Sequence, residues 1–94
     1  MFESKQTWDG KSPIDPKHEK ILRDMLIGEG GMLSDEEKEF AKRTSYGDLG
    51  KVLRKKYYNG TSITFPIGGV SYEMTWNKVA KAIHRWVREE AEKQ

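Results

Sequence analysis

The chain carries one dense group of side chains that could bind a polyanion. Lysines and an arginine crowd into six positions, and a pair of tyrosines follows directly. Cationic side chains attract phosphates, and neighbouring aromatic rings offer surfaces on which nucleic-acid bases stack. This combination indicates binding of DNA or RNA; the alternative is a helix whose lysines only face solvent. The candidate residues are Lys51, Arg54, Lys55, Lys56 and Tyr58.

A second basic stripe lies further along the chain, where cations recur every three or four residues. This spacing places them on one face of a helix, opposite an apolar stripe. These cations would extend the binding surface of the first group if both stripes share one face of the molecule. Otherwise they only form the solvent-exposed side of their helix. These residues are Lys78, Lys81, Arg85 and Arg88.

Charge is distributed unevenly along the 94 residues, although the net charge is only +2. Residues 49–88 contain eight basic residues and one acid, Glu73, whereas residues 1–48 contain eight basic and eleven acidic residues. A basic half of this kind favours a polyanionic partner, such as nucleic acid or a nucleoprotein complex. Alternatively, these basic residues only form a polar surface in contact with water.

Residues typical of catalysis or metal binding do not occur together. The chain has no cysteine, and its two histidines, His18 and His84, have no second ligand at metal-binding spacing. The glycines before Leu33 precede a helix start, which is where phosphate-binding loops occur. This segment lacks the lysine of a phosphate loop, and its acidic residues would repel phosphate. We therefore expect a protein that is not an enzyme and binds no metal ion or cofactor.

Length and composition predict a single soluble domain. Hydrophobic residues make up 35% of the chain, and three Trp, four Tyr and three Phe argue against disorder. No apolar run is long enough to cross a membrane, and the N-terminus lacks the apolar region of a signal peptide. A cytoplasmic protein is expected, with residues 1–14 as an N-terminal arm or loop and residues 15–94 as a compact domain.

Two short helices are expected in the first half of the chain. The first should begin at Pro16, behind the N-cap Asp15, and end at the glycines that start with Gly28. The second should begin with a capping box, in which Ser34 and Glu37 exchange hydrogen bonds with each other's backbone.

The stretch SITFPIGGVSYEMTW, residues 62–76, predicts a β-hairpin. Its glycine pair 68–69 tolerates the positive φ of a two-residue turn, which places Ile67 opposite Val70. The apolar pairs then share one face, which we expect to pack on the third and fourth helices. Pro66 cannot donate to a neighbouring strand, so the first strand should be an outer edge. The expected core residues of the hairpin are Phe65, Tyr72 and Met74.

A helix is expected on each side of this hairpin. The third helix should begin behind Ser45 and end at the pair 59–60, and the amphipathic C-terminal helix should begin behind Thr75. Apolar residues recur at helical spacing in all four helices. The expected apolar positions are Ile21, Leu22, Met25, Leu26, Phe40, Ala41, Leu49, Val52, Leu53, Tyr57, Trp76, Val79, Ala80, Ile83, Trp86 and Val87.

The order of helix, helix, helix, hairpin and helix resembles the winged helix-turn-helix fold. The resemblance covers residues 16–75 and rests on element order, not on a sequence signature. It implies that residues 48–58 form the DNA-reading helix and residues 61–75 the wing. Two features depart from the pattern: Gly50 stands where base-reading side chains are usual, and the wing tip has no Lys or Arg.

The segment GGVSYEMTWNKVAKAI resembles hairpin-plus-helix modules in accessory proteins of phages and mobile elements. We therefore expect a small α+β, winged-helix-like accessory protein that binds nucleic acid or a nucleoprotein complex. The alternative is an inhibitor or adaptor that binds a host defence protein, as anti-CRISPR factors do. Ile67 and Val70, at a projecting hairpin tip, would be its partner-binding residues. A homodimer through the outer hairpin edge is a third alternative.

Overall fold

Four helices and three strands make up the described part of the chain, residues 4–57 and 62–92 of a computed structural model. The α+β class is confirmed, as is the order of three helices, a hairpin and a final helix. The elements are β1 (Ser4–Thr7), α1 (Pro16–Ile27), α2 (Asp35–Arg43), α3 (Tyr46–Lys56), β2 (Ser62–Ile67), β3 (Val70–Thr75) and α4 (Trp76–Glu92).

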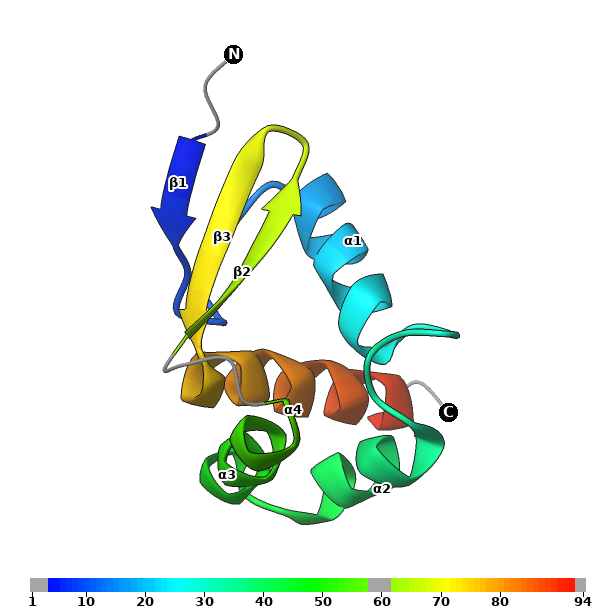
Figure 1. Cartoon of the computed structure of the whole chain (residues 1–94). Helices are drawn as coiled ribbons and strands as arrows, with labels where there is room; N and C mark the ends of the chain where they lie inside the picture. The colour runs from blue at the N-terminus through cyan, green and yellow to red at the C-terminus, as the bar shows by residue number, and fades with distance from the viewer. Residues whose placement is uncertain (1–3, 58–61, 93–94) are drawn as a thin grey trace.

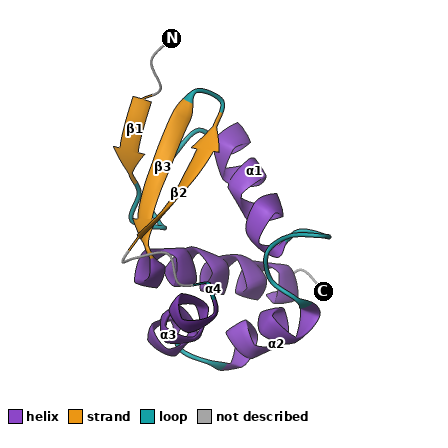
Figure 2. Ribbon diagram, in the orientation of Figure 1, coloured by secondary structure: helices purple, strands orange, loops and turns teal. Residues whose placement is uncertain are grey.

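Helix α4 runs through the middle of the molecule (Figure 1). The sheet and α1 lie on one side of it, and α2 and α3 lie on the other. Strand β3 continues into α4 without a loop, so the sheet stands over the N-terminal end of this helix (Figure 2). The predicted apolar stripe of α4 is entirely buried, and Ala82 is buried beside it. The core therefore forms around α4.

Side-chain caps fix the starts of the first three helices as the sequence predicts. Asp15 Oδ1 accepts a hydrogen bond of 2.9 Å from the Lys17 backbone N–H. Ser34 and Glu37 form the full capping box, and Ser45 Oγ accepts from the Asp48 N–H at 3.2 Å. These bonds satisfy backbone donors that the first turn of a helix leaves unpaired.

The hairpin forms in the predicted register. Gly68 and Gly69 have φ angles of 55° and 82°, in the left-handed region that a tight turn between strands requires. Ile67 lies opposite Val70, and the ladder continues to the pair of Ser62 and Thr75. Strand β2 is an edge of the sheet, as Pro66 predicts.

Part of the N-terminal stretch that was expected to be an arm or loop is a strand. Residues 4–7 form β1, which pairs in parallel with β3 and gives the sheet the order β1–β3–β2. Trp8 then donates its backbone N–H to the Glu73 carbonyl at 3.0 Å and packs its buried ring against Trp86. Backbone pairing holds this strand, and its exposed polar side chains carry no alternating pattern.

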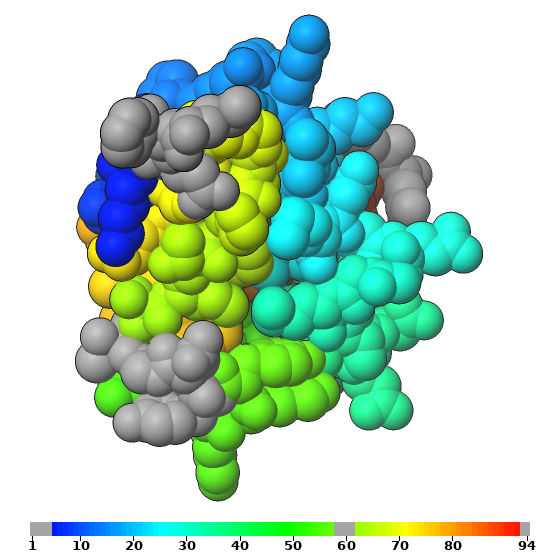
Figure 3. All heavy atoms as spheres, turned by 45° about the horizontal axis from the view of Figure 1, so that its top comes forward, coloured from blue at the N-terminus to red at the C-terminus, as the bar shows by residue number. Residues whose placement is uncertain are grey.

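The hairpin packs on α4, as expected, and on α1, whereas it makes less contact with α3 than expected. Helix α1 lies along the hairpin (Figure 3). The Tyr72 hydroxyl is hydrogen-bonded to His18 Nδ1 at 2.7 Å. Ile67 is only 4% exposed and Val70 is half-buried, so the prediction of an exposed apolar tip is wrong. His18 of α1 also lies against the turn, with its Nε2 atom 3.0 Å from where a Cβ of Gly68 would stand.

Three residues expected on apolar helix faces are instead exposed. Ile21, Met25 and Val52 expose 45%, 41% and 40% of their surface. On α1, the buried line passes through Leu22 and Leu26, because only this side of the helix meets the hairpin and α4. The apolar stripe read from the sequence is therefore wider than the face that the fold buries.

Candidate anion-binding pocket

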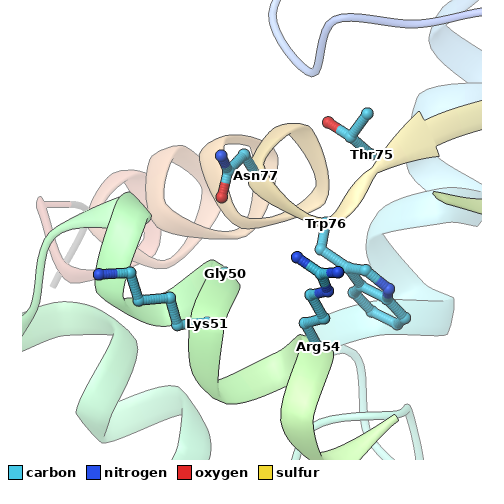
Figure 4. A pocket seen from close by; sticks show the side chains of 6 residues that line it. All are labelled: Gly50, Lys51, Arg54, Thr75, Trp76 and Asn77. Carbon is cyan, nitrogen blue, oxygen red and sulfur yellow. The ribbon is translucent and has the colours of Figure 1, made fainter. Parts of the chain in front are cut away.

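A hollow of about 270 Å³ lies where α3 crosses the N-terminal end of α4 (Figure 4). Helix α3 supplies one side of it and the junction between β3 and α4 supplies the other. Two of the cations predicted from the sequence stand at this hollow. The lining residues are Gly50, Lys51, Arg54, Thr75, Trp76 and Asn77.

The close crossing of the two helices depends on Gly50. A Cβ atom at this position would lie 2.6 Å from Asn77 Oδ1 and 3.5 Å from the Trp76 carbonyl oxygen. A glycine therefore lets the backbone of α3 approach the first turn of α4. This contact explains why a glycine stands where a DNA-reading helix usually has a base-reading side chain. Gly50 is buried against α4 and serves helix packing.

The N-terminal end of α4 has no side-chain cap within the part of the chain that the structure describes. Thr75, which was expected to cap it, is the last residue of β3 and pairs with Ser62. The first N–H groups of a helix lack intrahelical acceptors, and the helix dipole adds partial positive charge at this end. The start of this 17-residue helix therefore favours an anion in the pocket.

Lys51 and Arg54 add two full positive charges to this end of α4. Both side chains are exposed, and neither has an ion-pair partner among residues 4–57 and 62–92. Arg54 extends beside the Trp76 ring, and Lys51 lies on the other side of Gly50 (Figure 4). Together they offer donors that suit phosphate or carboxylate oxygens.

One residue of the second basic stripe, Lys81 of α4, lies close to α3. The Lys81 ammonium lies 5.0 Å from the ring centroid of Tyr46, the first residue of α3. Helical spacing places Lys78 and Arg88 on the same side of α4 as Lys81. Lys55 likewise follows Lys51 by one turn on the exposed side of α3.

Two of the predicted cations are held by carboxylates elsewhere. Lys56 pairs with Glu37 at 3.1 Å and ties α3 to α2, while Arg85 Nη2 lies 3.7 Å from Glu19 Oε2 of α1. These two side chains hold neighbouring elements together. Tyr58 lies outside the described residues.

The pKa of Glu37 agrees with an ion pair to Lys56. Burial raises the pKa of this carboxyl, but hydrogen bonds from the Ser34 backbone and from Lys56 outweigh burial, so the pKa is lowered. The pKa of Lys56 is raised, chiefly through its hydrogen bond to Glu37. The Lys56 charge is therefore compensated, whereas the charges of Lys51 and Arg54 face solvent.

His84 is half-buried near the turn between α2 and α3. Burial lowers its pKa, the nearby Arg88 lowers it further, and a hydrogen bond with the Thr44 backbone opposes both effects. Its Nε2 atom is buried without a partner among the described residues. That part of the chain also holds no group of three or more His, Cys, Asp or Glu side chains placed to bind a metal ion.

Sequence reasoning found Lys51 and Arg54 but missed the other side of the pocket. Asn77 stands in an amphipathic segment without any special spacing, and Thr75 was assigned only a capping role. Gly50 was the available signal, because a glycine inside a helical pattern often marks a close approach of another backbone. The sequence did not show which element approaches it.

Comparisons of the chain with protein-family models, with curated proteins and with solved structures find no match. Among the described helices, none combines the length and the apolar character needed to cross a membrane. What defines the molecule is its α+β fold, with a positively charged pocket at the crossing of α3 and α4.

Proposed function

We propose that the protein binds nucleic acid, or a nucleoprotein complex, through α3 and the N-terminal end of α4. The observation that carries this proposal is the pocket, which brings Lys51 and Arg54 to the uncapped start of α4. Phosphates of a nucleic-acid backbone match these donors, and Lys55 and Lys81 extend the positive surface on either side. In this proposal the protein acts by binding alone.

The element order supports a winged helix-turn-helix arrangement, in which α3 faces DNA and the hairpin forms the wing. In this proposal β1 and α4 are additions to that order. Because the hairpin tip packs on α1, the DNA contacts are assigned to α3 and α4 and not to the wing. The likeness of residues 68–83 to phage and mobile-element modules supports an accessory role in such an element.

A second candidate function is direct binding to a protein, as an inhibitor or adaptor of a host defence system. The supporting surface is not the hairpin tip but the exposed side of α1. Ile21 and Met25 border a shallow hollow with Met32, and exposed apolar side chains of this kind suit a protein contact. Serine at both Ile21 and Met25 would abolish such binding and leave nucleic-acid affinity unchanged.

A salt series with a labelled random duplex and a labelled single strand tests the nucleic-acid proposal. We expect dissociation constants of roughly 1–100 µM at moderate salt, weakening steeply as salt rises. The variant Lys51→Glu/Arg54→Glu should weaken binding strongly. A matched control, Lys17→Glu/Lys20→Glu, makes the same charge change on exposed positions of α1. Equal losses for the two variants would show that only net charge matters and would contradict the pocket's role.

A further inference from the structure

We infer that the protein forms a weak, twofold symmetric dimer in which α1 packs antiparallel against α1 of a second copy. The inference does not depend on the proposed nucleic-acid binding, because α1 and α3 lie on opposite sides of α4 (Figure 1). It assigns to a second copy the surface that the second candidate function gives to a host protein.

Two large apolar side chains lie one turn apart on the outer side of α1. Ile21 and Met25 are both exposed, and they border a shallow hollow of about 530 Å³. The half-buried Met32, from the loop that follows α1, also lines this hollow. Burial of such apolar surface against a partner is favourable, and methionine side chains adapt readily to the shape of a contact. The three residues therefore form an apolar patch suited to a protein contact.

An unpaired cation and an unpaired anion accompany this patch. Lys17 and Asp24 are both exposed, and neither forms an ion pair among residues 4–57 and 62–92. They stand seven residues apart on one side of α1, beyond the three or four residues at which side chains of one helix pair. By contrast, the half-buried Glu19 and Arg23 are paired with residues of α4. The two free charges of α1 thus face outward together.

An antiparallel second copy matches the apolar patch and both charges at once. In a pair centred between residues 20 and 21, Lys17 of each copy stands at the level of Asp24 of the other. Ile21 then lies beside Ile21 of the second copy at the centre of the contact, with Met25 next to it. A twofold interface brings the same patch together from both molecules, so its charges must complement themselves. Parallel helices would instead place Lys17 against Lys17 and Asp24 against Asp24.

The extent of the patch predicts a weak dimer. Helix α1 has 12 residues and is therefore about 18 Å long. Interfaces that bury less than about 1,200 Å² in total belong mostly to transient complexes, and one pair of short helices falls in this class. We therefore expect a monomer–dimer equilibrium with a dissociation constant of roughly 0.01–1 mM.

Sedimentation equilibrium of the full chain tests this inference. The native protein should pass from monomer to dimer as its concentration rises through that range. Ile21→Ser removes the central apolar contact from both copies and should dimerise at least about tenfold more weakly. Val52→Ser makes a matched change at a similarly exposed residue of α3 and should dimerise as the native chain does.

Two outcomes would overturn the dimer. A native protein that stays monomeric at the highest concentration would leave the α1 surface to the host protein of the second candidate function. Equal weakening by Ile21→Ser and Val52→Ser would show that association does not use α1. Neither outcome bears on nucleic-acid binding by α3 and α4.

Exchange of the two charges tests the antiparallel arrangement. Lys17→Asp creates two like-charged pairs in the dimer, and so does Asp24→Lys, so each variant alone should dimerise at least about tenfold more weakly. An equimolar mixture of these two variants restores opposite charges and should recover the native affinity within about threefold. The double variant Lys17→Asp/Asp24→Lys should recover it as well. Lys55→Asp, an equal charge change on exposed α3, is the control. Recovery in neither the mixture nor the double variant would refute the antiparallel pairing.

A single introduced thiol gives an independent measure of the contact, because the chain has no cysteine. Ile21→Cys places two thiols side by side at the centre of the proposed dimer, within the short distance that a disulfide requires. Under mild oxidation this variant should form a covalent dimer at least about tenfold faster than Val52→Cys. Equal rates at both positions would indicate random collision and would contradict the proposed arrangement.

Discussion

At the residue scale, Gly50 is the position on which the pocket's geometry depends most. Its missing side chain sets the distance between α3 and α4, and the nearest obstacle to a larger residue is the end of the Asn77 side chain. A small addition there displaces one flexible amide. A larger one meets the α4 backbone and must separate the helices.

A series of substitutions at Gly50 tests this reasoning through stability. Alanine should change the free energy of unfolding by less than about 1 kcal/mol, because its better helix propensity offsets the shift of Asn77. Leucine should lower stability by roughly 1–3 kcal/mol, because it forces helices apart in a packed region. Urea denaturation measures both values. Gly47, where a Cβ would meet only Ser45 Oγ at an ordinary contact distance of 3.9 Å, is the control position for the same two substitutions.

His84 should make the free energy of unfolding decrease as the pH falls. Its pKa is lowered in the folded protein by burial and by Arg88, whereas the unfolded chain has the ordinary value of 6.5. Below pH 6.5 the unfolded chain therefore binds more protons, and stability falls as the pH decreases. The variant His84→Gln should lose less stability than the native chain between pH 7.5 and pH 5. An equal loss in both proteins would assign the pH dependence to other groups.

At the element scale, the strand β1 shows that the pattern of apolar and polar residues does not predict every strand. The hairpin could be predicted to the residue, because Gly68 and Gly69 fix the turn and apolar side chains alternate on both strands. Strand β1 is joined to β3 through backbone hydrogen bonds and exposes Lys5, Gln6 and Thr7. Such a strand leaves no periodic signal in the sequence.

Removal of the Trp8 side chain tests whether this N-terminal stretch belongs to the core. The ring is 2% exposed and lies 6.1 Å from Trp86 between centroids, so Trp8→Ala should lower the free energy of unfolding by about 3–5 kcal/mol. Lys5→Ala changes an exposed residue of β1 and should have little effect. Thermal denaturation of both variants gives the comparison. A small loss for Trp8→Ala would fit a loosely attached arm instead.

At the scale of the whole molecule, the sequence predicts a basic half but not which of its cations are free. Glu37 of the preceding helix neutralises Lys56, and Glu19 of the distant helix α1 approaches Arg85. Only folding brings these pairs together. Lys51 and Arg54 could be chosen from the sequence as binding residues, but their meeting with the start of α4 depends on the tertiary packing of α3.

Two neighbouring lysines test whether free cations, and not net charge, determine binding. Lys55 has no ion-pair partner among the described residues, whereas Lys56 is paired with Glu37. Lys55→Gln should reduce the salt dependence of nucleic-acid binding by about one phosphate contact, and Lys56→Gln should leave it nearly unchanged. The two variants have the same net charge. If net charge alone determined nucleic-acid binding, both would therefore bind with equally reduced affinity. Unequal salt slopes in this order would show that the fold selects, from one run of lysines, those that contact phosphate.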